Sequence, residues 1–378
     1  MVISGVKINA VILVLLGLNV FIPAALGLSF SLEPQPELGQ LRDFKGSELC
    51  QVAENSKHYL QSQRQDTFAV HPGKQIDDKI TLKRVEDTLA FICQTYREDV
   101  RAKRHSRLHD TAFLKQHFEF VRWRPDKETA TKIAGKSTNE TKARMLNNIP
   151  DEEIFLTKYY TKLLDGSPVK TQHYDQALYA LPEDEQGLSL AQAELQKAQL
   201  TRFRFTRQQI IAGALEKDKR AKPLVWLTEE ALHDVLLQGT GVLKVDGKIR
   251  YFNVHRNNGI AYDYSIGKRE QPRYWYFVET PEIMGYGHDQ PSKIAIKPQV
   301  TFAGNIAELG VGKLIMVSYR DNKGQVSRLG ILADQGGAFD NNLFQLDLLV
   351  DSYRGWSDYH SYNGHLPDYA RAWILLLK

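Results

Sequence analysis

The sequence predicts a mainly β protein with helices near its N-terminus. Residues 45–123 are rich in helical patterns, hairpin signals dominate from residue 224 onward, and residues 371–377 read Arg-Ala-Trp-Ile-Leu-Leu-Leu, the pattern of a buried strand. Because the hairpins follow one another without intervening helices, they favour antiparallel barrels over a parallel βαβ sheet.

The first residues predict export. Lys7 is the only charge before Glu33, and an apolar run fills residues 8–28. The small residues Ala25 and Gly27 stand at the two positions that a signal peptidase recognises. Residues 1–27 are therefore predicted to be a cleaved signal peptide. The run is also close to the ~20 residues that span a bilayer, so a retained membrane anchor is the alternative. Both readings place the rest of the chain in the periplasm or cell envelope, with any membrane association through residues 8–28.

Two helical stretches precede residue 100 and carry the two cysteines. They cover residues 47–63 and 81–96, and apolar residues recur in the second at helical spacing. Cys50 and Cys93 both lie on apolar faces. In an exported protein they form either a Cys50–Cys93 disulfide or two buried free thiols.

The middle of the chain alternates between polar and strand-like segments. Residues 125–150 are lysine-rich without an apolar period, which predicts a loop or linker, and residues 155–182 predict short strands. A polar segment of helical composition covers residues 188–200. Hairpins are then predicted around Asp246-Gly247 and around residues 321–324.

Composition and motifs exclude several classes of function. The chain is 42% hydrophobic and 25% charged, as expected of a globular protein, and its net charge is only +4. No basic stripe alternates with aromatic residues, which disfavours a nucleic-acid partner. The sequence contains no HExxH, closely spaced Cys/His set, Gly-x-Ser-x-Gly, P-loop or dinucleotide fingerprint, so neither a metal nor an organic cofactor is expected.

One segment has catalytic character. An apolar strand runs into Asp334, followed by Gly336 and Gly337, and Asp347 stands between two leucines on a likely strand. A glycine pair lets the backbone turn sharply and approach a ligand closely. A carboxyl group among apolar neighbours should have a raised pKa and could serve as a general acid. An aspartate after a strand is more often a turn former or cap.

The same segment resembles the C-terminal three-aspartate domain of the membrane-bound lytic murein transglycosylase A (MltA) family. Further matches occur in the family's order over residues 110–378. They are Phe155–Thr161 (Tyr-Tyr-Thr motif), Tyr174–Pro182, Arg207–Leu215, Leu236–Gly241 (Gln-Gly-Ser-Gly motif), Asn258–Lys268 (Ser-Ile-Gly-Lys motif) and Arg371–Leu376.

This resemblance implies a double-psi β-barrel domain with an inserted smaller β domain and a glycan groove between them. The barrel domain, with the N-terminal helices, would comprise residues 28–162 and 297–378, and the inserted domain residues 163–296. The implied activity is cleavage of peptidoglycan glycan strands between N-acetylmuramic acid and N-acetylglucosamine, with formation of a 1,6-anhydro ring.

The resemblance also assigns roles to residues. Asp347 would be the general acid and base, and Asp334 would polarise or orient the site. Thr161 and Gln238 would bond acetamido groups, unless they serve only the architecture. Backbone at Gly336 and Gly337 would approach the sugar. Tyr159, Tyr160 and Trp356 would stack on sugar faces, although such aromatics are more often core residues.

Several departures favour a second reading, a non-catalytic module that binds peptidoglycan or another polysaccharide on the same fold. Lys158 and Lys162 replace the glycine and proline that flank the family's Tyr-Tyr-Thr motif, and Ile260 replaces a histidine. Asn305 stands for the first of the three aspartates. A third reading keeps the barrel but cleaves other β-linked glycans, as barwin-like and endoglucanase-like relatives do.

Overall fold

A computed structural model of the protein describes residues 29–74, 76, 80–288, 290–322, 324–336, 339 and 342–378. The predicted signal or anchor segment, residues 1–27 with its apolar run over 8–28, lies outside these described residues, and so does Gly337. Within the described part of the chain, no helix is long and apolar enough to cross a membrane.

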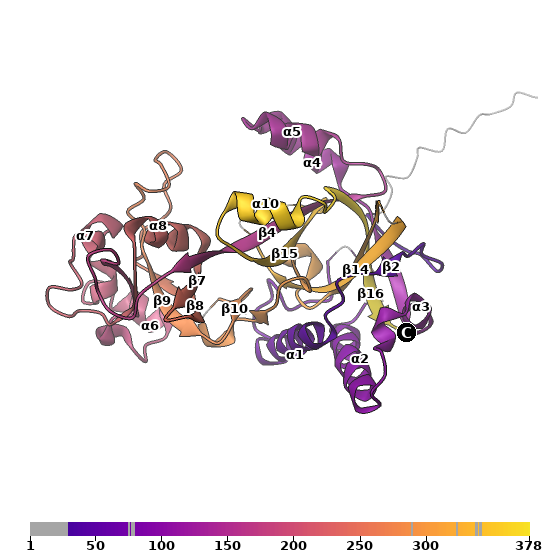
Figure 1. Ribbon diagram of the computed structural model, residues 1–378, viewed down its shortest axis with the longest axis horizontal. Helices are drawn as coiled ribbons and strands as arrows, with labels where there is room; N and C mark the ends of the chain where they lie inside the picture. The colour runs from indigo at the N-terminus through magenta and orange to yellow at the C-terminus, as the bar shows by residue number, and fades with distance from the viewer. Residues whose placement is uncertain are drawn as a thin grey trace, which may run out of the picture.

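Six strands close into a barrel at the centre of the larger part of the molecule (Figure 1). Their order is β16-β13-β14-β12-β15-β4, and the ring closes where Tyr369 and Ala370 of β16 pair with Phe155 and Ile154 of β4. The six strands are β4 (Ile154–Asp165), β12 (Thr301–Ala303), β13 (Leu314–Asp321), β14 (Gly324–Asp334), β15 (Gln345–Tyr353) and β16 (Tyr369–Leu377).

The barrel mixes parallel and antiparallel pairs. The predicted hairpin around residues 321–324 is confirmed as β13–β14, and the predicted strand at the C-terminus is β16. The antiparallel barrel favoured by the hairpin signals is correct for four of these pairings and wrong for two, because β12 runs parallel to β14 and β15 runs parallel to β4. These partners come from distant parts of the chain, so no hairpin signal marks their pairing.

Short strands extend the sheet beyond the barrel. Residues 118–123 lie in the region that the sequence predicted to be rich in helices, but they form strand β3. They do so because their backbone pairs antiparallel with β16. The additional strands here are β1 (Phe30–Leu32), β2 (Gln40–Leu41) and β3 (Phe118–Trp123).

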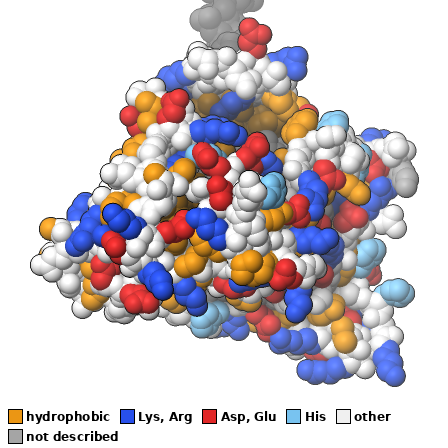
Figure 2. Space-filling view, turned by 60° about the vertical axis from the view of Figure 1, so that its left-hand side comes forward, with side chains coloured by type: hydrophobic (Ala, Val, Ile, Leu, Met, Phe, Trp, Pro, Cys, Tyr) orange, Lys and Arg blue, Asp and Glu red, His pale blue; other side chains and the backbone are white. Residues whose placement is uncertain are grey.

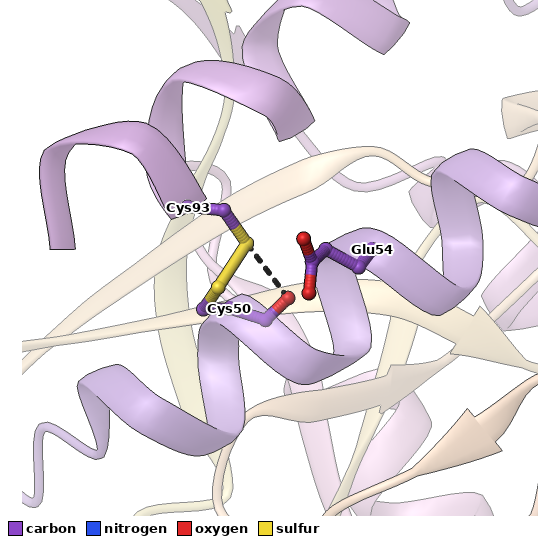
Figure 3. Close-up of side chains that lie close together, drawn as sticks. All are labelled: Cys50, Glu54 and Cys93. Atoms are coloured by element: carbon purple, nitrogen blue, oxygen red, sulfur yellow. Dashed lines mark hydrogen bonds between the residues drawn. A yellow bond between two sulfur atoms is a disulfide. The ribbon is translucent and has the colours of Figure 1, made fainter. Parts of the chain in front are cut away.

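The predicted N-terminal helices pack against one flank of the barrel (Figure 1). Helix α2 starts at Leu82 and is capped by Thr81, whose side chain accepts a hydrogen bond from the Arg84 amide. Cys50 of α1 and Cys93 of α2 form a disulfide that joins the two helices, which confirms the disulfide reading (Figure 3). The helices are α1 (Gly46–Ser62), α2 (Leu82–Arg101) and α3 (Thr111–His117).

Residues 125–150 form a helical hairpin, so the loop or linker prediction is wrong. The hairpin consists of α4 (Lys127–Lys136) and α5 (Glu140–Asn147), capped by the side chains of Asp126 and Asn139. Alanines and a single leucine, rather than a long apolar stripe, pack it onto the barrel: Ala130, Ala134 and Leu146 are buried together with Phe344. Small residues bury a helix face while leaving only a weak apolar period in the sequence.

A second, separate hydrophobic core lies within residues 174–277 and occupies one end of the molecule (Figure 1). The predicted hairpin around Asp246-Gly247 is confirmed there as β7–β8. The elements of this region are β5 (Gln176–Tyr179), α6 (Leu190–Leu195), α7 (Arg207–Ile211), β6 (Pro223–Leu227), α8 (Glu229–Gln238), β7 (Thr240–Val245), β8 (Lys248–Asn257) and β9 (Trp275–Thr280).

Strand β4 connects the two cores. Its first part pairs with β15 and β16 of the barrel, and Leu163–Asp165 pair with β7 of the smaller region. The chain returns through β10 (Ile283–Met284) and β11 (Ala295–Ile296). The exact domain limits, 162/163 and 296/297, stay a prediction. Helices α9 (Ile306–Leu309) and α10 (Trp356–Asn363) complete the barrel side.

Cationic and anionic side chains are interspersed on the face drawn in Figure 2, in keeping with the small net charge. This face therefore offers no single-sign field that would select a partner by charge alone.

Candidate active site

A groove lies where the barrel meets the smaller region. It encloses a cavity of about 630 Å³ and takes its lining from both parts of the chain. The barrel contributes residues of β4, β12, β14 and β15, and the smaller region contributes the end of α8 together with residues of β8 and β10. Most site residues implied by the family resemblance line this cavity: Tyr159, Tyr160, Thr161, Gln238, Asp334, Gly336 and Asp347. Trp356 does not line it, and Gly337 lies outside the described residues.

The sheet places the two aspartates two strands apart in one row. Ala303 of β12 pairs with Asp334 of β14 on one side and with Asp347 of β15 on the other. Asp347 in turn pairs with Thr157 of β4. Adjacent strands lie about 4.8 Å apart, so the backbones of the two aspartates are separated by roughly 10 Å. Ala303 lines the groove together with the two aspartates.

Asp347 has the electrostatic character of a general acid. Burial raises its pKa to about 7, and the negative charge of Asp334 contributes, while the Thr157 hydroxyl and Lys158 act in the opposite direction. Its Oδ1 atom is buried without a hydrogen-bond partner among the described residues. The neighbouring Leu346 and Leu348 are fully buried, and the barrel core that they fill keeps water away from one side of the carboxyl group.

Asp334 has two different partners. Its Oδ1 accepts a hydrogen bond from the Gln335 amide (2.8 Å), which is the turn-stabilising role. Its Oδ2 accepts a hydrogen bond from the Tyr159 hydroxyl (2.7 Å), which lies in the groove. Burial raises the pKa of Asp334 to about 6, and these two hydrogen bonds, together with the charge of Lys293, limit the rise. The carboxyl group therefore both anchors the turn and faces the cavity.

Gly336 lies at the edge of the cavity. A Cβ atom at this position would lie 2.9 Å from the ring of Phe339, which is itself buried. The glycine thus allows the turn after Asp334 to pack against Phe339. Gly337 is outside the described residues.

Thr161 and Gln238 line the groove but are also tied to the architecture. The hydroxyls of Thr161 and Ser352 share a 2.6 Å hydrogen bond, which links β4 to β15. The Gln238 side chain accepts from the Lys162 amide (2.9 Å) and donates to the Tyr160 carbonyl (3.4 Å), so it fixes the end of α8 against β4.

The three aromatic candidates have different surroundings. Tyr159 faces Asp334, whereas the ring of Tyr160 stacks on Tyr359 of α10 with the ring centres 4.9 Å apart. Trp356 is 68% exposed at the start of α10 and does not line the groove. Only Tyr159 therefore combines a place in the groove with a contact to one of the two aspartates.

Sequence reasoning missed Thr157 and Lys293. Thr157 lies within the quoted Tyr-Tyr-Thr stretch, and strand alternation places it on the same face as Tyr159. Lys293 lines the groove and donates a 2.7 Å hydrogen bond to Asn253. No local signal marked it, because it lies outside the matched motifs.

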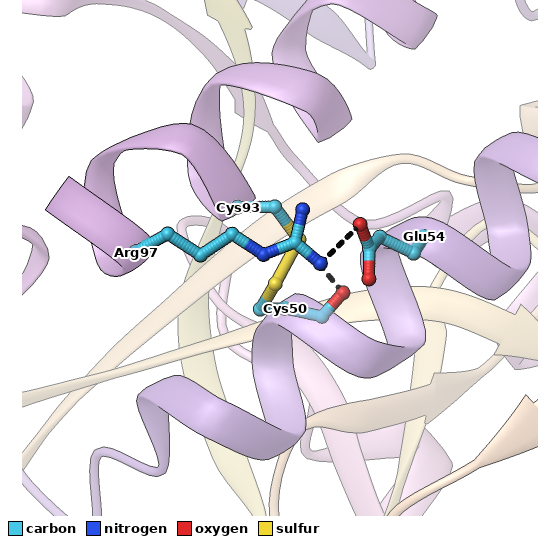
Figure 4. The surroundings of a disulfide bond; sticks show 4 residues. All are labelled: Cys50, Glu54, Cys93 and Arg97. Atoms are coloured by element: carbon cyan, nitrogen blue, oxygen red, sulfur yellow. Dashed lines mark hydrogen bonds and ion pairs between the residues drawn. A yellow bond between two sulfur atoms is a disulfide. The ribbon is translucent and has the colours of Figure 1, made fainter. Parts of the chain in front are cut away.

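The described residues contain a single group that brings three potential metal ligands together: Cys50, Glu54 and Cys93. Figure 4 shows that both sulfur atoms are joined in the disulfide and that Glu54 pairs with Arg97, at 2.6 Å. Because a metal would require free thiolates, this group does not fit a metal centre in its present form.

Residues 155–294 match the family model described as the MltA specific insert domain. These residues are therefore similar to the MltA insert domain. This match spans the smaller region and its two connections to the barrel, and it confirms the MltA resemblance found in the sequence motifs. No curated protein matches the sequence.

Solved MltA structures share the whole fold. MltA from Neisseria gonorrhoeae is 13% identical with a TM-score of 0.56, and the match covers 92% of each chain. A membrane-bound lytic murein transglycosylase from Agrobacterium tumefaciens is 15% identical with a TM-score of 0.52, covering 90% of this chain and 96% of that one.

E. coli MltA with bound chitohexaose is 15% identical with a TM-score of 0.50, covering 92% and 94%. These likenesses confirm the expected MltA fold, a double-psi β-barrel with an inserted smaller β domain and a groove between them.

Proposed function

We propose that this protein is a lytic transglycosylase that cleaves the β-1,4 bond between N-acetylmuramic acid and N-acetylglucosamine in peptidoglycan. The observation that carries the proposal is Asp347: a buried carboxyl group with a pKa of about 7, in the groove of an MltA-type fold. E. coli MltA binds chitohexaose, an amino-sugar oligomer, which supports a glycan as the ligand of the groove.

A single carboxyl group suffices for this chemistry. Asp347 donates its proton to the glycosidic oxygen as the bond to the muramic acid C1 breaks, and the N-acetylglucosamine leaves with that proton. The C6 hydroxyl of the muramic acid attacks C1 and returns a proton to the Asp347 carboxylate. The attack is intramolecular, so little orientational entropy remains to be lost and no water has to be positioned. A hydrolase would instead need a second carboxylate to act as base or nucleophile.

Asp334 and its tyrosine support this cycle. The Tyr159 hydrogen bond and the charge of Lys293 favour the ionised form of Asp334, whose negative charge in turn favours the protonated form of Asp347. Like charges in one low-dielectric site separate the two pKa values. We assign this positioning role to Asp334, and the lining of the sugar sites to Thr161, Gln238, Tyr159, Tyr160 and Gly336.

The departures from the family motifs leave Asp347 and Asp334 in the groove, and the retention of these two carboxyl groups favours the enzyme over a binding module. Lys158 reaches away from Asp334 to the Pro367 carbonyl (2.9 Å) and Asp368 (3.2 Å). Lys162 pairs with Asp234, and Asn305 caps α9 through the Glu308 amide (3.2 Å). We also propose that the protein is exported to the periplasm or cell envelope, because residues 1–28 have the pattern of a signal peptide or membrane anchor.

Digestion of purified peptidoglycan sacculi tests the proposal. The wild-type protein should release fragments with 1,6-anhydro ends, and Asp347→Asn should release at least about 10²-fold less, the usual contribution of a general acid. Asp351→Asn, an exposed position on the same strand, is the matched control and should cleave normally. Reducing ends would move the protein to the hydrolases, and intact sacculi bound equally by wild type and Asp347→Asn would make it a binding module.

A further inference from the structure

A second cavity lies between the α4–α5 hairpin and the barrel. It has a volume of about 340 Å³. Its apolar lining includes Ile133 and Met145 of the hairpin and Phe155 and Phe344 of the barrel side, and its polar lining includes Lys142 and Asn342. A small apolar interior with a few polar groups at its edge is the usual character of a ligand pocket.

This cavity lies on the same face of β4 as the groove. Alternate residues of a strand face the same side, and Phe155 and Thr157 line the cavity while Tyr159 and Thr161 line the groove. Asp347 pairs with Thr157, so it lies between the two compartments. Phe155 is two residues from Thr157, so the rise along β4 places its backbone about 7 Å from the Thr157–Asp347 pair.

A chain of side chains connects the cavity to the Asp347 row. Asn342 donates to the Gln345 side-chain carbonyl (3.0 Å), and the Gln345 side-chain amide donates to the Thr157 hydroxyl (2.7 Å). The Thr157 hydroxyl in turn lowers the pKa of Asp347. A ligand in the cavity would therefore lie against the residues that surround the proposed general acid.

The hairpin that covers the cavity is cationic. Residues 127–147 contain Lys127, Lys132, Lys136, Lys142 and Arg144 but only Glu128 and Glu140, a net charge of +3. Lys127 pairs with Asp151 and Lys132 pairs with Glu128. By contrast, no ion pair joins the other three cations to another described residue. The exposed Lys142 stands at the cavity itself.

We propose that this cavity binds the acidic peptide branch that peptidoglycan carries on its muramic acid residues. The proposal rests on the proposed function, because it takes a glycan in the groove as the source of that branch. The peptide combines carboxylates, which suit Lys142, with alkyl side chains, which suit Ile133, Met145 and Phe155. A strand without its peptides keeps only the lactyl carboxylates of its muramic acids and lacks both the alkyl side chains and the further carboxylates of the peptide. The cavity would therefore make the protein prefer peptide-bearing strands.

Two glycan substrates test this inference in the full-length protein: peptidoglycan strands with their peptides, and the same strands after an amidase has removed the peptides. Wild type should have the higher kcat/KM for the peptide-bearing strands. Lys142→Glu should lower the ratio of the two kcat/KM values about fivefold, the size expected of one partly screened charge interaction. Met145→Trp, which fills the cavity, should lower the ratio as well.

Lys136→Glu is the matched control, since it reverses an exposed cation of the same hairpin that does not line the cavity. It should leave the ratio unchanged. A ratio near one in wild type, or one that Lys142→Glu and Met145→Trp leave unaltered, would overturn the inference while the proposed function stands.

Binding measurements with the Asp347→Asn protein distinguish failure of the proposed peptide site from failure of the proposed catalytic function. Calorimetry with defined glycan tetramers should give tighter binding of the peptide-bearing tetramer, and Lys142→Glu should remove the difference. If wild type cleaves neither strand, the proposed function fails, and this binding comparison still decides the peptide site. Equal affinity for both tetramers would refute it.

Discussion

The Tyr159 hydroxyl donates a 2.7 Å hydrogen bond to Asp334 Oδ2, although 175 positions separate the two residues in the chain. Tyr159 lies on β4 and Asp334 at the end of β14, with β15 and β12 between them in the sheet. Tyr159, Asp334 and Asp347 all line the same groove. At Asp334, burial raises the pKa most and this hydrogen bond lowers it. The charge of Asp334 in turn raises the pKa of Asp347.

Tyr159→Phe should destabilise the protein in a pH-dependent manner. The hydrogen bond favours the charged form of Asp334, whose pKa is about 6, so its loss should raise that pKa. Hydrogen bonds to charged groups contribute about 2 kcal/mol. We expect a loss of that size at pH 8, where Asp334 is ionised, and a smaller loss at pH 5. Denaturant unfolding at both pH values measures it; Tyr160→Phe, the control, should change stability by less than about 0.5 kcal/mol. Equal losses at both pH values would contradict this role.

The rate of glycan cleavage should fall as the pH rises through about 7. Asp347 must carry its proton to act as the acid, and burial raises its pKa to about 7. Above that pH, kcat/KM should fall about tenfold per pH unit. Because Asp334 raises the pKa of Asp347, Asp334→Asn should move this falling limb to lower pH. Rates measured from pH 5 to 9 on soluble strands give both profiles, and a limb that stays in place in Asp334→Asn would argue against the coupling.

Asp347→Asn should stabilise the protein at pH 8. The pKa of Asp347 is about 7 in the folded protein against an ordinary 3.8, so the folded state holds the proton more tightly. The resulting stabilisation is complete below about pH 4 and is lost as the pH rises through 7. The neutral asparagine avoids that loss. A rise of about 3 pKa units is equivalent to about 4 kcal/mol, so the variant should exceed wild type by about that amount at pH 8 and by little near pH 4. Unfolding curves at both pH values measure the difference, and an advantage of the same size at pH 4 would show another cause.

Removal of the Cys50–Cys93 disulfide should destabilise the protein without altering the groove. The bond closes a loop with a sequence separation of 43, for which loop entropy predicts about 4 kcal/mol. We expect the double variant Cys50→Ala/Cys93→Ala to lose most of that stability. Its kcat/KM should stay within about twofold of wild type at a temperature where it is folded, because the disulfide lies outside the groove lining. Unfolding midpoints of wild type with and without reductant provide the control.

Local signals determined the elements whose partners are near in sequence. The turn residues Asp246-Gly247 specify the β7–β8 hairpin, and the apolar spacing of α2 specifies a helix with Cys93 on its buried side. The ordered motifs likewise indicated the fold and brought Asp334 and Asp347 forward as a pair. The hairpin and the helix depend on residues close together in the sequence, where turn propensity and periodicity act, whereas the motifs depend on their order along residues 110–378.

Only the tertiary structure decided the pairing of β12 with both β14 and β15, which places Ala303 between the two aspartates. Parallel pairs between distant segments leave no hairpin signal, and the burial that gives Asp347 its pKa comes from strands far away in the chain. The α4–α5 hairpin was missed for a related reason, since its alanines become an apolar face only against Phe155 and Phe344. The residues alone therefore supplied the candidate acid, while the closure of the barrel supplied its low-dielectric environment and the groove beside it.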